Sequence, residues 1–214
     1  YIVKPSIESS GAKNVMRLQS DSQKIFINGK HTTFETVEKI IKRDFLVQEF
    51  LEQHQILKNI YPCSLNTFRV VTLRMDGDIH VLQSIVKFGD KGNFVDFTVN
   101  LGGLHCGIKD NGTLSPFAVD LNYKKYYTHP YTGYSFEHVV IPQFPSLLNF
   151  SKNLHRCLLY FDMASWDIAI DKNGEAALIE SNLIYQGFSF LQVHNGPLFG
   201  NFTDKLLEAK ITRY

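Results

Sequence analysis

The chain has 214 residues, of which 44% are hydrophobic and 13% aromatic, and its 22 Lys and Arg residues nearly balance 21 Asp and Glu residues. This length and apolar content are sufficient to bury a core in one or two compact units, so the composition excludes a disordered chain. A net charge of +1 without a long block of one sign gives no indication of a nucleic-acid-binding surface or a polybasic membrane anchor.

The cysteines and the apolar runs indicate the compartment. Cys63, Cys106 and Cys157 are scattered and odd in number, without the close pairing of a zinc site or a disulfide framework. We interpret them as reduced thiols without a catalytic role. No apolar run is long enough to span a bilayer and no signal-peptide pattern opens the chain, which favours a cytoplasmic protein. Because Tyr1 lies within an apolar run, we expect the chain to be a fragment of a longer protein.

The first fifty residues are typical of short strands around a polar loop. Strands are predicted over residues 1–5, 15–19, 23–29 and 45–53. Pro5 ends the first strand, and Gly11 gives the following loop the freedom to bring backbone amides close to a ligand. Thr33 can cap a helix over the next apolar-periodic segment.

The remainder is rich in strands. A turn at 76–78 predicts a hairpin between residues 66–75 and 79–88, and residues 93–108 form a strand with a glycine turn. Residues 110–143, rich in Tyr, Pro and His, are predicted to be an irregular surface excursion. The last elements are a helix over 145–159, a hairpin over 166–182 and a helix over 202–209. The fold class is therefore α+β, with largely antiparallel sheets in two lobes that divide near residues 52–64.

Three oxygen-bearing side chains converge on the last hairpin. Side chains alternate between faces along a strand, so Glu180 and Asn182 share a face, and the tight turn brings Asp167 near them. Two carboxylates that close repel each other without a cation, and hard oxygen ligands suit magnesium. The alternative interpretation is an exposed hairpin face that simply carries polar residues, and spacing by itself weighs both equally.

A second signal lies at the end of the first strand. Lys4 precedes the Ser- and Gly-rich residues 6–11, and an ammonium beside flexible backbone amides is a suitable phosphate cradle. The ordinary alternative is a solvated lysine at a strand end.

Taken together, these segments resemble the ATP-grasp superfamily. The resemblance rests on residues 3–15 (VKPSIESSGAKNV), 47–51 (VQEFL), 66–72 (NTFRVVT), 87–103 (KFGDKGNFVDFTVNLGG) and 166–182 (WDIAIDKNGEAALIESN). Their order matches the lysine strand and phosphate loop, the adenine hinge, the arginine strand, a basic segment with a glycine pair, and the metal-binding hairpin. The phrases LNTFRVVT, HPYTG and NGPLFG are most similar to the sugar-transfer-associated branch, related to α-L-glutamate ligases.

The resemblance implies a role for each matching position. The phosphates of ATP would be bound by Lys4, Ser9, Ser10 and Gly11, and the adenine pocket would be lined by Gln48, Glu49 and Leu51. Charge on the γ-phosphoryl group would be offset by Arg69 and Lys87. Magnesium would be held by Asp167, Glu180 and Asn182. From spacing alone, Arg69 would be a surface ion pair and Lys87 a solvated strand end. Some relatives carry an arginine where this chain has Ser165, so we expect its substrate handling to differ.

The resemblance also implies an architecture. Residues 1–52 would be part of the ATP-grasp N-terminal lobe, whose first portion precedes this chain, and residues 53–214 would be the C-terminal lobe, with the ATP cleft between them. The implied function is an ATP- and magnesium-dependent carboxylate-amine ligase that forms an acyl phosphate, acting on a small-molecule, sugar or peptide precursor in cell-surface modification. A small-molecule kinase and a non-catalytic nucleotide-binding module are the alternatives, and the oligomeric state stays open.

Overall fold

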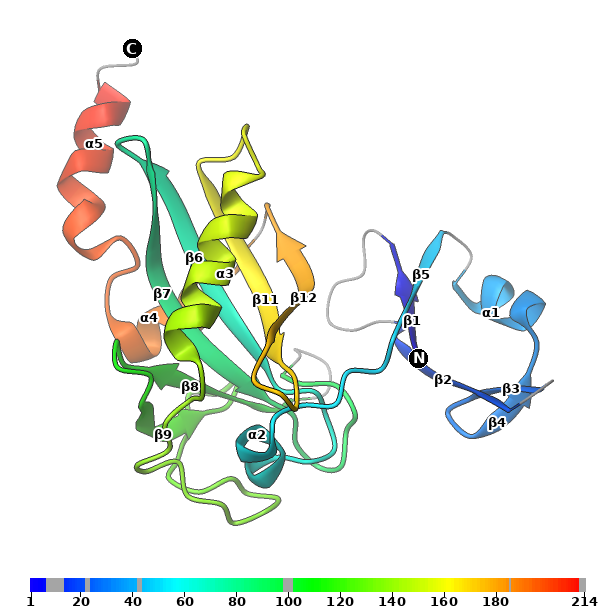
Figure 1. The fold of residues 1–214 in the computed structure, drawn as a ribbon. Coiled ribbons are helices and arrows are strands. Elements are labelled where there is room, and N and C mark those ends of the chain that lie inside the picture. Colours follow the sequence, from blue (N-terminus) through cyan, green and yellow to red (C-terminus); the bar gives the residue numbers. More distant parts are fainter. Residues whose placement is uncertain (7–13, 22–23, 42–43, 98–101, 185, 212–214) are drawn as a thin grey trace. The chain divides into compact units, whose positions relative to one another are not determined.

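The computed structural model describes residues 1–6, 14–21, 24–41, 44–97, 102–184 and 186–211. These residues fall into two compact units, one made from Tyr1–Glu52 and the other from the described residues after Glu52 (Figure 1). The predicted residues Ser9, Ser10 and Gly11 lie outside the described part of the chain. None of the described helices combines the length and apolar character needed to cross a bilayer.

The first unit is an antiparallel sheet with one helix. Its described strands run in the order β4-β3-β2-β1-β5. Their bounds are β1 Ile2–Pro5, β2 Met16–Asp21, β3 Lys24–Ile27, β4 Lys30–Thr32 and β5 Phe45–Gln48, and helix α1 covers Phe34–Ile41. Thr33 Oγ1 accepts the amide of Thr36 at 3.3 Å, which confirms the predicted helix cap. Val3 of β1 and Val37 of α1 are fully buried in the core of this unit.

The second unit is built on a larger antiparallel sheet. Its described strands run in the order β10-β9-β8-β7-β6-β11-β12 (Figure 1). Their bounds are β6 Thr67–Met75, β7 Asp78–Phe88, β8 Leu104–Ile108, β9 Leu114–Val119, β10 Lys125–Tyr126, β11 Met163–Ile170 and β12 Ala176–Asn182. Both predicted hairpins are present: Asp76 and Gly77 have positive φ values of 53° and 79° between β6 and β7, and a turn at 171–174 joins β11 to β12.

Helices cover both faces of the larger sheet. They are α2 Gln55–Ile60, α3 Phe144–Arg156, α4 Ser189–Asn195 and α5 Thr203–Ile211, with a short 3-10 helix η2 at Gly200–Phe202. Helix α3 packs on β6, β7 and β11, over a core that includes Phe68, Val86 and Trp166. Helix α4 packs on β7 and β8 on the other side, where Val71, Ile85 and Leu191 form a smaller cluster.

The prediction for residues 110–143 was wrong in part. Strand β9 extends the sheet within this segment, and Phe136 and His129 are fully buried. These residues reach the core as isolated side chains from turns, so they leave no periodic pattern in the sequence. The strand predicted over 45–53 ends at Gln48, and the helix predicted to 159 ends at Arg156.

Candidate functional site

A row of charged side chains crosses three neighbouring strands of the larger sheet. Asp167 on β11 lies directly opposite Arg69 on β6 and also directly opposite Glu180 on β12. Directly opposed residues of an antiparallel pair project to the same face, so the three side chains share one face. Lys87 on β7 lies opposite Thr67, two residues before Arg69, and therefore projects to that face as well.

The alternation along β6 and β7 explains why these charges avoid the main core. Phe68 and Val70 flank Arg69 and point into the core beneath α3. Val86 and Phe88 flank Lys87 and belong to the same core. A one-residue shift in register would exchange the two faces, so the apolar pattern fixes where the charges lie.

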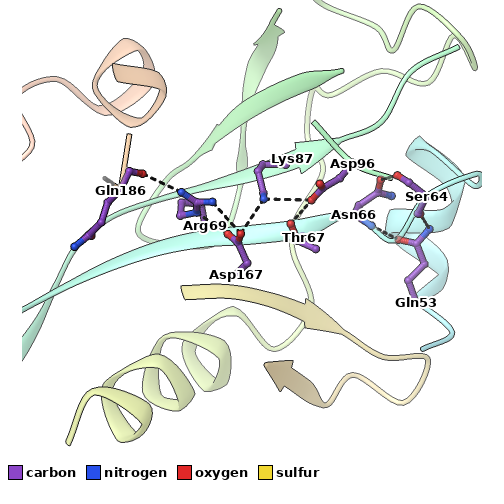
Figure 2. A network of polar contacts seen from close by, with 9 residues as sticks. All are labelled: Gln53, Ser64, Asn66, Thr67, Arg69, Lys87, Asp96, Asp167 and Gln186. Carbon is purple, nitrogen blue, oxygen red and sulfur yellow. Dashed lines mark hydrogen bonds and ion pairs between the residues drawn. The ribbon is translucent and has the colours of Figure 1, made fainter. Parts of the chain in front are cut away.

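The Asp167 carboxylate joins both basic side chains (Figure 2). Arg69 donates from Nε to Oδ1 at 2.5 Å and from Nη2 to Oδ2 at 2.9 Å, which makes the contact bidentate. Lys87 Nζ lies 3.2 Å from Oδ2 of the same carboxylate. The Asp167 side chain is only 6% exposed, against 18% for Arg69 and 11% for Lys87, so the two cations lie nearer to solvent than the anion between them.

Charge governs the protonation state at the centre of this site. Burial by itself raises the pKa of the Asp167 carboxyl, but the positive charges of Lys87 and Arg69 outweigh burial and hold that pKa below its usual range. Burial lowers the pKa of Arg69, and the negative charge of Asp167 more than reverses this effect. Asp167 is therefore a carboxylate at neutral pH, and Arg69 is a cation.

The two basic side chains retain donors for a further ligand. A guanidinium has five N–H groups. Arg69 directs two at Asp167 and one, from Nη1, at the backbone carbonyl of Gln186 at 3.0 Å. An ammonium has three N–H groups, and Lys87 has ion pairs with Asp167 and Asp96. Within the described residues, these contacts leave two donors on Arg69 and one on Lys87 for an anion.

Gln186 connects the segment after β12 to this face, and sequence analysis did not predict this contact. Its side-chain oxygen accepts from Ser165 Oγ at 2.5 Å, while its backbone carbonyl accepts from Arg69. The hydroxyl of Ser165 is thereby committed to Gln186. A backbone acceptor has no residue-type signature, so no pattern could have indicated this contact.

Asp96 is the second site residue that sequence analysis missed. Its carboxylate accepts a hydrogen bond from Thr67 Oγ1 and lies 3.4 Å from Lys87 Nζ (Figure 2). Burial raises the pKa of Asp96, and the Lys87 ammonium opposes that shift. One feature of the sequence could have indicated Asp96. It is an acidic residue within residues 87–103, close in sequence to Lys87, the basic residue with which it pairs.

The donor set of the predicted metal trio suits magnesium only in part. Opposite Asp167 lies Glu180, and opposite Ser165 lies Asn182, so the hairpin brings the trio onto one face as predicted. Asn182 Nδ2 is buried and has no hydrogen-bond partner among the described residues, but it is a donor nitrogen, whereas a metal would bind the amide oxygen Oδ1. Asp167 is already shared by two cations, and the described part of the chain contains no group of three His, Cys, Asp or Glu side chains placed to hold a metal. The oxygen-bearing residue types are of the kind that magnesium prefers, and Glu180 and Asn182 would be its main ligands.

The first unit brings two of its predicted nucleotide-binding residues, Lys4 and Gln48, onto adjacent strands. Lys4 on β1 lies opposite Leu46 on β5, and Ile2 lies opposite Gln48. Lys4 and Gln48 therefore share one face of this sheet, and both are half-buried. Glu49 and Leu51 follow β5 directly, exposed and half-buried respectively.

The fold and site define an α+β protein with antiparallel sheets and a buried carboxylate, Asp167, that contacts both Arg69 and Lys87. A sequence model of the sugar-transfer associated ATP-grasp family matches residues 1–205, and the chain belongs to that family. Members of the wider ATP-grasp group are ATP-dependent enzymes that generally use ATP and Mg2+. Comparisons with curated proteins and with solved structures gave no match.

Proposed function

We propose that this protein is an ATP- and magnesium-dependent carboxylate-amine ligase. A carboxylate oxygen of one substrate attacks the γ-phosphorus of ATP, and ADP leaves, which gives an acyl phosphate. The nitrogen of an amine, or another nucleophile, then attacks the acyl carbon, and inorganic phosphate leaves. The observation that supports this proposal is the pair of cations, Arg69 and Lys87, held on one buried carboxylate with donors to spare.

The pair suits phosphoryl transfer for an electrostatic reason. Negative charge shifts between the oxygens of the transferred group during the reaction, and the protein stabilises it best with donors that are already oriented. Asp167 fixes the guanidinium plane of Arg69 through two hydrogen bonds and holds Lys87 beside it. The remaining N–H groups of both cations can then meet phosphoryl oxygens without first reorganising.

Magnesium, when bound by Glu180, Asn182 and the shared carboxylate of Asp167, would neutralise charge on the phosphate chain. In the first unit, we propose that Lys4 contacts the phosphates, together with Ser9, Ser10 and Gly11. Gln48, Glu49 and Leu51 would contact adenine. These assignments rest on the family match and on the shared strand face of Lys4 and Gln48.

The substrates follow from the family name only in broad terms. We propose a sugar or peptide precursor as the partner, and cell-surface modification as the purpose, because the matching family is associated with sugar transfer. The ATP-dependent step would take place in the cytoplasm. Neither a nucleic-acid partner nor insertion into a membrane forms part of this proposal.

Hydroxylamine trapping tests the acyl phosphate directly. The protein is incubated with Mg-ATP, hydroxylamine and a panel of amino-acid, uronic-acid and peptide carboxylates, and hydroxamate and ADP are both measured. A ligase gives hydroxamate in step with ADP for at least one carboxylate, because hydroxylamine replaces the natural amine. Arg69→Ala should abolish both products, whereas Arg156→Ala, at an exposed position, serves as the matched control.

The two alternative functions give different results in the same experiment. A kinase releases ADP and leaves a stable phosphorylated product without hydroxamate. A non-catalytic module releases no ADP with any substrate but still gives a heat of Mg-ATP binding in calorimetry. Absence of both ADP release and heat of Mg-ATP binding would refute the proposed function.

A further inference from the structure

The segment that follows β7 folds back towards Lys87, near the end of β7. It begins at Gly89 and brings Asp96 back against Thr67 and Lys87. Thr67 and Lys87 are themselves directly opposed across β6 and β7. Asp96 therefore contacts both members of one cross-strand pair.

Close backbone contacts fix the path of this segment. A Cβ on Gly89 would lie 2.6 Å from the Tyr61 ring and 2.7 Å from the backbone oxygen of Val95, which leaves no space for a side chain. Tyr61 donates from its hydroxyl to the backbone oxygen of Asn93 at 2.9 Å, and His129 Nε2 lies 3.0 Å from the carbonyl of Gly89. The segment is thus anchored at its start and its middle, so the position of Asp96 is set by the fold.

Lys87 needs such a support because its side chain is long and flexible. An ammonium on four methylene groups has many rotamers, and ordering it costs conformational entropy. The carboxylate of Asp167 lies 3.2 Å from Nζ on the side of Arg69, and that of Asp96 lies 3.4 Å away in the direction of Thr67 (Figure 2). Two carboxylates restrict the position of the ammonium more than one does. The third N–H group of Lys87 remains for a ligand oxygen.

We propose that Asp96, oriented by the hydroxyl of Thr67, is a positioning residue that holds the Lys87 ammonium beside Arg69 for the transferred phosphoryl group. This inference rests on the proposed function, since it assigns Asp96 to the same reaction. Asp96 acts through Lys87 and does not itself contact the nucleotide. Arg69 and Lys87 are thus faced by two carboxyl groups, those of Asp96 and Asp167.

Asp96→Asn tests the proposal because asparagine keeps the shape and can still accept from Thr67. We expect kcat to fall roughly 10- to 100-fold, since displacement of a catalytic contact by about 1 Å has effects of that size. Binding of Mg-ATP should not weaken, because the site loses a negative charge. A purely structural carboxylate would instead lower the melting temperature and leave kcat unchanged in the folded fraction.

The surrounding residues supply the controls. Asp90→Asn makes the same substitution in the same segment, away from Lys87, and should leave kcat at the wild-type value. Thr67→Val removes the donor to Asp96 and should lower kcat in the same direction, while Thr67→Ser should restore it. If Asp96→Asn fails to fold, the two variants Thr67→Val and Thr67→Ser test the proposal instead. Equal kcat values for these two variants would overturn it.

A crystal structure of Asp96→Asn separates this proposal from the proposed function. We expect Lys87 Nζ to lose its contact at position 96 and to shift from its wild-type position towards Asp167, whatever reaction the protein performs. A Lys87 ammonium that keeps its wild-type position, or a kcat equal to that of the wild type, overturns the positioning role without contradicting the proposed ligase function. Loss of hydroxamate formation by the wild-type protein contradicts only the proposed function.

Discussion

Arg69 and Asp167 are 98 positions apart in the chain and lie directly opposite each other on neighbouring strands. Their two hydrogen bonds, at 2.5 and 2.9 Å, join the two oxygens of the carboxylate to one edge of the guanidinium. A fork of this kind fixes both position and orientation, which a single ion pair cannot do. The fork therefore defines the direction in which the other N–H groups of Arg69 face.

The fork predicts that lysine cannot replace arginine at position 69. Arg69→Lys keeps the positive charge but loses the bidentate contact and the hydrogen bond to the Gln186 carbonyl. We expect kcat/KM to fall roughly 100-fold, similar to the loss of one oriented donor at a transition state. Steady-state kinetics of ADP release checks this, with Arg156→Lys as the control at an exposed arginine. Activity within experimental error of the wild type would mean that Arg69 serves only as a charge.

Asp167 and Glu180 should respond differently to the loss of a carboxylate, although they face each other. Asp167→Asn leaves Arg69 and Lys87 with one buried acceptor fewer, so we expect the free energy of unfolding to fall by roughly 3 kcal/mol. Glu180 is exposed, and Glu180→Gln should keep the wild-type unfolding free energy while abolishing turnover. Urea denaturation and magnesium titration of the activity measure the two effects. A Glu180→Gln protein with normal magnesium dependence would show that position 180 holds no metal.

Lys4 is predicted to contribute to nucleotide affinity. Lys4→Ala removes a cation from the strand face that also carries Gln48, and we expect the Kd for Mg-ATP to rise roughly 10-fold, as for one charge-assisted hydrogen bond. Calorimetry is the measurement. Lys24→Ala, an exposed lysine on β3 of the same unit, provides the reference variant. If both alanine variants bind equally well, Lys4 is an ordinary strand-end residue.

Stability should fall on mild acidification because buried histidines remain neutral in the folded protein. Burial, and then the neighbouring His194, lower the pKa of His105 to about 3 from the ordinary value of 6.5. Below about pH 6.5 this histidine binds a proton in the unfolded chain but stays neutral in the folded chain. Its contribution to stability is therefore fully present above that pH and is lost as the pH falls towards 3.

At pH 5 the loss from this one group is about 2 kcal/mol. Burial also lowers the pKa of His129, His155 and His194, and these groups act in the same direction. Urea midpoints at pH 7.5 and pH 5 measure the effect. His105→Gln should reduce the difference between the two midpoints, and an equal difference in both proteins would contradict the origin assigned to it.

Two adjacent glycines provide a matched test of backbone packing. Gly103 has a φ of 109°, and a Cβ there would lie 2.5 Å from the backbone oxygen of Phe88. Gly102 also has a positive φ, 78°, but nothing lies within 4 Å of its Cβ position. We expect Gly103→Ala to lower the melting temperature clearly more than Gly102→Ala, since only the first combines strain with a backbone clash. Equal shifts would indicate that the backbone adjusts at Gly103.

Local patterns predicted the elements but not the contacts that join them. The turn at Asp76 and Gly77 and the alternation around Arg69 are both encoded within a few residues, so the hairpins and their polar face followed from the sequence. The pairing of Arg69 with Asp167 depends on β11 lying beside β6, which no local pattern specifies. Sequence analysis therefore placed these residues in the site but assigned Asp167 to metal alone.

The residues that were missed share one property: they act through nonlocal or backbone contacts. Asp96 reaches Lys87 only because residues 89–97 turn back, and Gln186 contributes a carbonyl that any residue type could supply. Helix α4 was also missed, because its seven residues are too few for a clear periodicity. Resemblance to the family singled out Arg69, Lys87 and Asp167, but the way in which they share charge depends on the pairing of β6 with β7 and β11.

The order of the strands has a consequence for biosynthesis. The cation pair lies on β6 and β7, whereas its buried counter-ion arrives with β11, some eighty residues later in translation. Until Asp167 has emerged from the ribosome, Arg69 and Lys87 belong to an incomplete sheet with no carboxylate from β11 between them. A nascent chain that ends before β11 therefore lacks the carboxylate that joins Arg69 to Lys87, so the proposed phosphate site is complete only after β11 has been synthesised.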